Sequence, residues 1–161
     1  AMRGCGPAVD DATLLKIDRN HAVPKGHRVF SEDTSYKMRA LLRLVVTKGT
    51  GKKADAPGYR VGGKTGTANK PVAGGYSQTR VVTSFAGVFP MDEPRYAMVV
   101  MLDEPQPTAE TYGFRTAGWN AAPIMSTTVS RIAPMLGVRP DKNREPDMST
   151  VLPFVHEKAE H

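Results

Sequence analysis

The spacing of apolar residues predicts an amphipathic helix in the first half of the chain. Its apolar positions recur at the spacing of one helix face: Met38, Leu41, Leu42 and Val45. Arg39 and Arg43 fall on another face. The hydroxyl of Ser31 suits the N-cap, and Gly49 is placed to terminate the helix. One helix over residues 31–49 is therefore expected.

Strands are predicted at residues 59–67, a candidate that three glycines weaken, and at residues 80–89 and 95–103, which are rich in β-branched and aromatic residues. Residues 12–17 are a further candidate. A tight turn, PMDEP, separates the second and third runs, which predicts an antiparallel hairpin. The third run is almost continuously apolar and is expected to be buried on both faces. The segment NKPVAGGYSQ, residues 69–78, reads as a loop.

A second amphipathic helix is predicted near the end of the chain. One apolar stripe traces it: Ala122, Met125, Val129, Ile132 and Leu136. Asn120 is the expected N-cap, Pro123 fits the first turn, and Gly137 ends the helix. The order of elements indicates an α+β fold, an antiparallel sheet with an amphipathic C-terminal helix. We expect one domain over residues 1–139 and a polar, loosely held tail over 140–161.

Composition and charge argue against a membrane-spanning, nucleic-acid-binding or metal-binding protein. The 161 residues are 40% hydrophobic and 24% charged, which is typical of a globular domain. No apolar run approaches the roughly 18 residues that span a bilayer, and the first residues lack the layout of a signal peptide. The net charge of +6 comes from scattered cations, with Lys52-Lys53 the single doublet, so no nucleic-acid partner is predicted. Cys5 is the only cysteine, and no histidine pair has metal-ligand spacing. We therefore predict no metal and no cofactor.

The segment GYRVGGKTGTA, residues 58–68, matches two incompatible chemistries. It fits the phosphate-binding loop G-x-x-x-x-G-K-[ST], and it contains K-T-G, a motif of penicillin-binding enzymes. A phosphate loop needs a buried strand before it and a helix that begins at the Lys-Thr. KKADAP precedes the segment, and Gly66 and Pro71 follow the lysine, so both flanks are absent. An extended strand that carries K-T-G is the better prediction.

The wider context of K-T-G resembles a known family. The runs RLVVTKGTGKKADAPGYRVGGKTGTA, SFAGVFP, RYAMVVMLDEP and TAGWNAAPIM are similar to class B penicillin-binding proteins, which are monofunctional peptidoglycan D,D-transpeptidases. The similarity is greatest to the division-specific (septal) type of Gram-negative bacteria and covers roughly residues 13–138. It implies the penicillin-binding/β-lactamase-like transpeptidase fold, with about three of that fold's five sheet strands present here.

The resemblance also implies roles for individual residues. Lys64 and Thr67 would be catalytic, Lys64 as a fixed positive charge in the cleft and Thr67 through a backbone amide in the oxyanion hole. The substrate-binding residues would be Thr65, Gly66 and Thr67: the two hydroxyls would hold a terminal carboxylate, and Gly66 would leave space for the acyl group. The competing interpretation of the same residues is an ordinary edge strand with an exposed lysine.

The chain departs from the family pattern because it contains neither S-x-x-K, which carries the nucleophilic serine, nor Ser-x-Asn. We therefore expect the C-terminal part of a transpeptidase domain, inactive alone and not acylated by penicillin. The uncovered sheet edge predicts self-association. The alternatives are a non-catalytic β-lactam sensor, a division-complex interaction module, an elongation-type transpeptidase and a serine β-lactamase relative.

The resemblance supplies the remaining expectations. For the parent protein it implies peptidoglycan synthesis and cell-wall cross-linking in cell division. The implied partners are a peptidoglycan stem peptide, β-lactams and division-complex proteins, at the periplasmic face of the inner membrane. Among other candidates, Asp103 and Glu104 are expected to have a structural or solvated role rather than to act as a carboxylate pair, because adjacent strand residues point to opposite faces. Trp119 and Tyr112 are expected to pack against the last helix.

Overall fold

The computed structural model of the chain describes residues 28–149 and 151–155. The chain divides into two compact units, residues 1–36 and 37–161. In the first unit the Oγ of Ser31 accepts a hydrogen bond from the Thr34 backbone amide at 3.0 Å, which confirms the predicted cap of helix α2 (Glu32–Thr47). The strand candidate at residues 12–17 lies outside the described residues. Within these described ranges, no helix combines the length and hydropathy needed to cross a bilayer.

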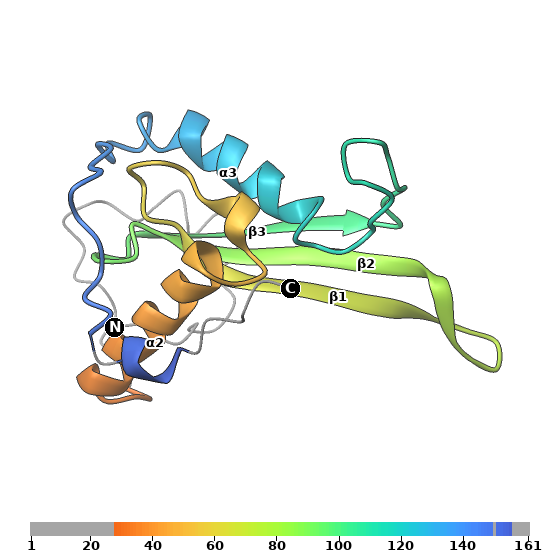
Figure 1. Cartoon of the computed structure of the whole chain (residues 1–161), viewed down its shortest axis with the longest axis horizontal. Coiled ribbons are helices and arrows are strands. Elements are labelled where there is room, and N and C mark those ends of the chain that lie inside the picture. The colour runs from red at the N-terminus through yellow and green to blue at the C-terminus, as the bar shows by residue number, and fades with distance from the viewer. Residues whose placement is uncertain (1–27, 150, 156–161) are drawn as a thin grey trace, which may run out of the picture. The chain divides into compact units, whose positions relative to one another are not determined.

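The second unit contains an antiparallel sheet of three strands in the order β1-β2-β3 (Figure 1). The strands are β1 (Gly62–Val72), β2 (Gly75–Phe89) and β3 (Tyr96–Asp103). Together with the helix that packs on the sheet, they confirm the predicted α+β class and the predicted hairpin.

The predicted loop at residues 69–78 is wrong, because β1 and β2 continue through most of it. Pro71 pairs with Tyr76 and Val72 with Gly75, after a register shift that follows Asn69. A proline is compatible with this position because β1 is an edge strand and the ladder is already irregular there. Positive φ angles at Gly74 and Gly75 close the turn. The result is a long hairpin that runs past the end of β3 (Figure 1).

The expectation that β3 is buried on both faces is also wrong. Its side chains alternate between half-buried and exposed. Met98 and Val100 pack against the main core, whereas Val99 and Met101 are 62% and 66% exposed. The continuous apolar run hid this alternation, because an apolar side chain marks burial poorly when only one face of a sheet is covered.

Helix α3 (Ala121–Ile132) covers the buried face of the sheet (Figure 1). The side chain of Asn120 accepts a hydrogen bond from the Ala121 amide at 2.7 Å, which confirms the predicted N-cap. Met125 and Val129 are fully buried in the main core together with Phe85. The helix ends at Ile132, one turn earlier than predicted.

The predicted apolar face of α2 is not the buried one. Met38 and Leu41 are 47% and 45% exposed, and the buried positions of the helix include Arg43 and Leu44. Arg43 is buried because its guanidinium has partners: it donates to Asp55 at 2.7 Å, to Glu145 at 2.6 and 2.7 Å, and to the Val61 carbonyl at 2.8 Å. A paired charge can occupy a core position that a hydrophobic pattern assigns to apolar residues.

Described residues after 139 contact α2. Glu145 pairs with Arg43, and Val151 joins a small apolar cluster with Ala40 and Leu44. A short 3-10 helix, η2 (Leu152–Phe154), follows. The division of the chain into domains at residue 139 stays a prediction.

An ion cluster holds the hairpin to the end of β3. The Glu104 carboxylate accepts from Lys70 at 2.8 Å and from the Arg80 Nη2 at 2.7 Å, and Lys70 also pairs with Asp103. These contacts confirm a structural role for Asp103 and Glu104. Hydrogen bonds from Arg80 and Lys70 lower the pKa of Glu104 from 4.5 to about 2.

This pKa shift predicts a pH dependence of stability. A carboxylate whose pKa is lower in the folded chain stabilises the fold fully above its unfolded pKa of 4.5, and that contribution is lost as the pH falls toward 2. We expect Glu104→Gln to flatten the decline of the thermal unfolding midpoint between these two pH values. Glu93→Gln, in the exposed β2–β3 turn, is the control. Identical pH profiles for Glu104→Gln and the unmodified chain would contradict the assignment.

Candidate functional site

The K-T-G residues lie on an extended edge strand. Lys64 pairs with Ala86 and Thr67 with Thr83 in the register of β1 and β2, and β1 is at the edge of the described sheet. No helix begins at Thr65, which excludes the phosphate-loop geometry. The predicted extended conformation at the sheet rim is confirmed.

A glycine at the start of β1 permits this close pairing. A Cβ atom built on Gly63 would lie 2.2 Å from the Ala86 carbonyl oxygen, a distance that real side chains do not reach. Only a residue without a side chain fits there without moving one of the two strands. Gly63 therefore lets β1 pair closely with β2, and this pairing fixes the backbone position of the next residue, Lys64.

Residues directly opposite each other in an antiparallel pair point to the same face. Thr65 pairs with the fully buried Phe85, and Thr67 pairs with the fully buried Thr83, whose hydroxyl donates to Asn120 at the start of α3. The two β1 threonines therefore point to the face that α3 covers. Lys64 alternates with them, so its Cβ leaves the strand on the other face. Its ammonium turns back to the strand edge and lies 3.4 Å from the Thr65 Oγ1.

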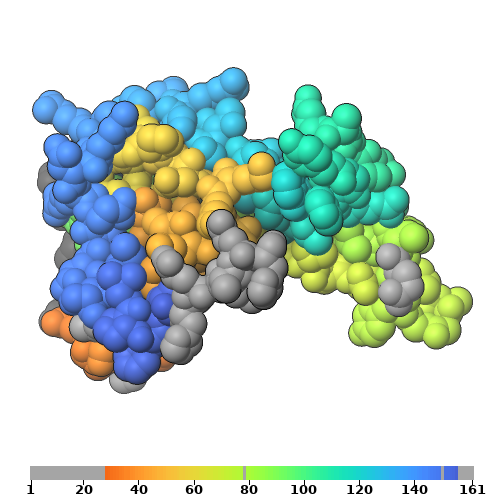
Figure 2. Space-filling view, in the orientation of Figure 1, coloured from red at the N-terminus to blue at the C-terminus, as the bar shows by residue number. Residues whose placement is uncertain are grey.

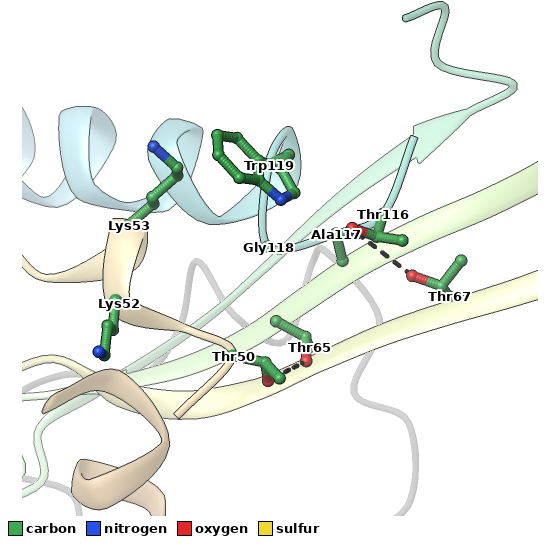
Figure 3. Close-up of a pocket in the computed structure, with 9 residues that line it drawn as sticks. All are labelled: Thr50, Lys52, Lys53, Thr65, Thr67, Thr116, Ala117, Gly118 and Trp119. Carbon is green, nitrogen blue, oxygen red and sulfur yellow. Dashed lines mark hydrogen bonds between the residues drawn. The ribbon is translucent and has the colours of Figure 1, made fainter. Parts of the chain in front are cut away.

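A pocket of about 500 Å³ lies beside the two threonines. Thr65 and Thr67 form its β1 side, and the segment between α2 and β1 contributes Thr50, Lys52 and Lys53. The remaining wall comes from the segment between β3 and α3: Thr116, Ala117, Gly118 and Trp119 (Figure 3). Figure 2 shows this last segment beside the β1–β2 hairpin.

Hydrogen bonds position both strand hydroxyls. The Oγ1 atoms of Thr65 and Thr50 are 2.9 Å apart, and the Thr67 Oγ1 accepts from the Ala117 amide at 3.2 Å (Figure 3). A hydroxyl has one proton to donate and can accept twice. The Thr67 proton is therefore not used by the Ala117 contact. Thr65 can also donate outward when Thr50 supplies the proton that they share.

The pocket is electropositive. Two of its lining residues are lysines and none is acidic. The ammonium of Lys53 lies 4.4 Å from the ring centroid of Trp119, a cation–π contact. Neutral hydroxyls next to ammonium groups favour an anionic oxygen as ligand, and a carboxylate is the simplest such group.

The structure brings together only some of the predicted site residues. Thr65 and Thr67 line the pocket, whereas Lys64 and Gly66 do not. The Lys64 side chain is exposed, and its ammonium donates to the Thr65 carbonyl at 2.9 Å. Gly66 is half-buried on the strand between the two threonines.

The sequence predicts only a packing role for Trp119, and no local sequence signal indicates its place in the pocket wall. Its ring stacks on Phe114 and meets Tyr112 edge-on, each at a centroid distance of 5.3 Å. The doublet Lys52-Lys53 was noted only for its charge. No local pattern relates Lys53 to Trp119, because their contact depends on how two distant loops fold.

The described residues contain no cluster of three or more His, Cys, Asp or Glu side chains that could hold a metal ion. Asp103 and Glu104, at the end of β3, form ion pairs with Lys70. Hydroxyl, ammonium, amide and indole groups are what the pocket offers a ligand.

Comparison with known proteins identifies the family. A family model, the penicillin binding protein transpeptidase domain, matches residues 9–126. The probable peptidoglycan D,D-transpeptidase FtsI of Caulobacter vibrioides is 47% identical over 125 residues, which are 72% of this chain and 21% of that protein. The stage V sporulation protein D of Bacillus subtilis is 39% identical over 136 residues, 84% of this chain and 20% of that protein.

Solved structures agree with this relationship. The transpeptidase domain of Burkholderia pseudomallei penicillin-binding protein 3 matches with a TM-score of 0.64 and 38% identity, over 83% of this chain and 36% of that one. Penicillin-binding protein 3 of Mycobacterium tuberculosis in complex with ampicillin matches with a TM-score of 0.62 and 30% identity, over 75% of this chain and 28% of that one.

The fold and the matched residues thus define the class of domain, a penicillin binding protein transpeptidase domain. The chain belongs to the penicillin-binding protein transpeptidase domain family, within its class B, FtsI-like members. This confirms the resemblance and the fold inferred from the sequence. The chain spans about a fifth of the length of the curated relatives it matches.

Proposed function

We propose that this chain is part of a peptidoglycan D,D-transpeptidase and forms the K-T-G wall of its active site. The observation that carries the proposal is the pair Thr65 and Thr67, side by side on one face of an edge strand in a pocket without acidic residues. Membership of the transpeptidase family and the relatives named D,D-transpeptidases support it.

In the proposed reaction a serine oxygen attacks the carbonyl carbon between the two terminal D-alanines of a stem peptide. The C–N bond breaks, the last D-alanine leaves as an amine that takes up a proton, and an ester to serine remains. The amine of a second stem peptide then attacks the ester carbonyl and loses a proton. The ester C–O bond breaks, the serine oxygen takes up a proton, and the new amide bond is the cross-link. This chain has no S-x-x-K serine, so its residues act in recognition and charge stabilisation.

The hydroxyls of Thr65 and Thr67 would donate to the terminal carboxylate of the peptide. The Thr67 backbone amide would supply half of the oxyanion hole for the negative oxygen of the tetrahedral intermediate. Gly66, between the two threonines, carries no side chain that could crowd an acyl group at the strand edge. Lys64 does not line the pocket, and its ammonium lies at the strand edge 3.4 Å from the Thr65 Oγ1. From there its positive charge would assist proton transfer at the serine.

β-Lactams are the second proposed ligand class, which the ampicillin complex of the Mycobacterium tuberculosis relative supports. The proposal includes a place in cell division, which the relatives named FtsI support. It also includes division-complex proteins as partners and a location at the periplasmic face of the inner membrane. Self-association through the sheet edge stays a prediction. The alternative function is a non-catalytic module that binds the same ligands. The lack of S-x-x-K in this chain favours that alternative over the others.

A chimera tests the proposed function. The matching segment of the Caulobacter transpeptidase is replaced by the corresponding residues of this chain, and acylation by fluorescent penicillin is followed on gels. We expect the chimera to be labelled, and we expect Thr67→Val to slow acylation by about tenfold, because a charge-assisted hydrogen bond is lost.

Glu93→Gln in the same chimera is the matched control and should label at the rate of the unmodified chimera. This chain alone should not be labelled. A folded chimera that takes up no penicillin would contradict the proposal, as would a Thr67→Val chimera that labels at the control rate. Labelling of the chain alone would place the nucleophile within these 161 residues.

A further inference from the structure

We propose that the pocket contains a second anion subsite, formed by Lys53 and Trp119, that binds a carboxylate in the acyl part of an acyl-D-alanyl-D-alanine peptide. The inference rests on the proposed function, in which Thr65 and Thr67 hold the terminal carboxylate. It adds a determinant of which acyl groups this site prefers.

The backbone of Lys53 is held in place by buried neighbours. Lys53 lies in a single 3-10 turn, η1 (Lys52–Ala54), closed by a 2.8 Å hydrogen bond from the Ala54 amide to the Gly51 carbonyl. Ala54 is fully buried in the main core, and Ser126 of α3 donates to the Asp55 carbonyl at 2.6 Å. Lys53 therefore leaves a fixed point of the backbone, which lowers the entropic cost of placing its ammonium.

Trp119 is equally well positioned. Its amide donates to the Thr116 carbonyl at 2.9 Å, and the next residue, Asn120, caps α3. Phe114 stacks on the indole with an interplanar angle of 15°. The opposite loop is close as well, since a Cβ atom on Gly118 would lie 2.7 Å from the Thr50 carbonyl oxygen. The aromatic surface is thus supported before any ligand arrives.

The contact between these two residues leaves the Lys53 charge available. An ammonium has three N–H donors, and a cation–π contact with one ring does not occupy all of them. Among residues 28–149 and 151–155, no acidic side chain forms an ion pair with Lys53. A positioned cation beside an apolar ring and without an acidic partner is suited to a ligand carboxylate attached to an aliphatic chain.

The pocket has room for a ligand that reaches both ends. Ligand pockets usually measure about 300–1,000 Å³, and this one measures about 500 Å³, more than a single terminal carboxylate fills. Figure 3 shows Lys53 and Trp119 on one side of the pocket and Thr65 and Thr67 on the other. The ligand class that would use both ends of the pocket is a peptide with two carboxylates.

Trp119 is the only tryptophan in the chain, so its fluorescence reports directly on this pocket. The probes are glutaryl-D-alanyl-D-alanine, which has two carboxylates, and glutaramoyl-D-alanyl-D-alanine, in which the acyl carboxylate is an amide. Titration of the full chain, checked by calorimetry, should show the diacid binding about fivefold more tightly, the size expected for a partly exposed ion pair.

Four variants test whether the preference for the diacid comes from the charge of Lys53. In Lys53→Gln the preference for the diacid should fall below about twofold, the remainder expected from long-range charge alone. Lys53→Arg keeps the charge and should keep the preference. Lys142→Gln removes one exposed charge outside the pocket and should leave the preference intact. Thr67→Val should weaken both probes equally.

Equal affinity for the two probes, no binding of either, or a preference that survives Lys53→Gln would each overturn the subsite. The proposed function fails separately: it fails if Thr67→Val binds both probes as tightly as the unmodified chain. A preference that still depends on Lys53 in that case would support the subsite while removing Thr67 from carboxylate recognition.

Discussion

Arg43→Ala is expected to lower the free energy of unfolding by about 3 kcal/mol. The guanidinium is buried and donates to two carboxylates and to the Val61 carbonyl, and its removal leaves these acceptors without a donor. We expect the lower end of the range for broken buried pairs, because the side chains of Asp55 and Glu145 are 41% and 43% exposed and can be hydrated. Urea unfolding followed by circular dichroism measures the change.

Arg131→Ala, an exposed arginine of α3, is the matched control and should change the free energy of unfolding by less than about 0.5 kcal/mol. If the Arg43 variant were no less stable than this control, the network would be structurally unimportant. A large loss would also affect the site, since Arg43 connects α2 to Asp55, just after Lys53, and to Val61, just before β1.

Gly63→Ala is expected to destabilise the chain by about 3 kcal/mol, at the upper end of the usual cost of overpacking. The new Cβ would lie 2.2 Å from the Ala86 carbonyl oxygen and 2.9 Å from the Gly87 Cα, both backbone atoms of β2. Neither atom can move without separating the strands that pair beside Lys64. The measurement is again the free energy of unfolding in urea.

Gly66→Ala is the matched control, with the same chemical change three residues along the same strand. Its Cβ would lie 2.7 Å from the Ser84 Oγ, a side-chain atom that can rotate away. We expect a loss below about 1 kcal/mol for this variant. Equal losses for the two glycine variants would show that the close approach of β2 at Gly63 is not what makes the glycine necessary.

Local patterns were sufficient for several elements. The extended conformation of the K-T-G segment followed from its flanks, since neither a preceding apolar strand nor a following helix is possible there. The Asn120 cap and the apolar stripe through Met125 and Val129 predicted α3 because capping and helical periodicity depend on neighbours along the chain. The family followed from longer runs around the same motif.

The same patterns failed where burial depends on distant partners. Val99 and Met101 are as apolar as their neighbours, yet they are exposed because of where α3 packs. Arg43 is polar, yet it is buried because Asp55 and Glu145 come to it from other parts of the chain. The spacing of apolar residues shows which side chains are hydrophobic. Whether a side chain is buried depends on which other parts of the chain pack over it.

The candidate site divides in the same way. By itself the sequence determined that Thr65 and Thr67 share one face of a strand, because alternate residues of an extended chain point the same way. Only the tertiary structure decided that this face meets the loop that carries Trp119, and that Lys53 reaches the same pocket. The physical reason is distance along the chain: a strand's alternation is local, whereas this pocket requires segments fifty or more residues apart to pack together.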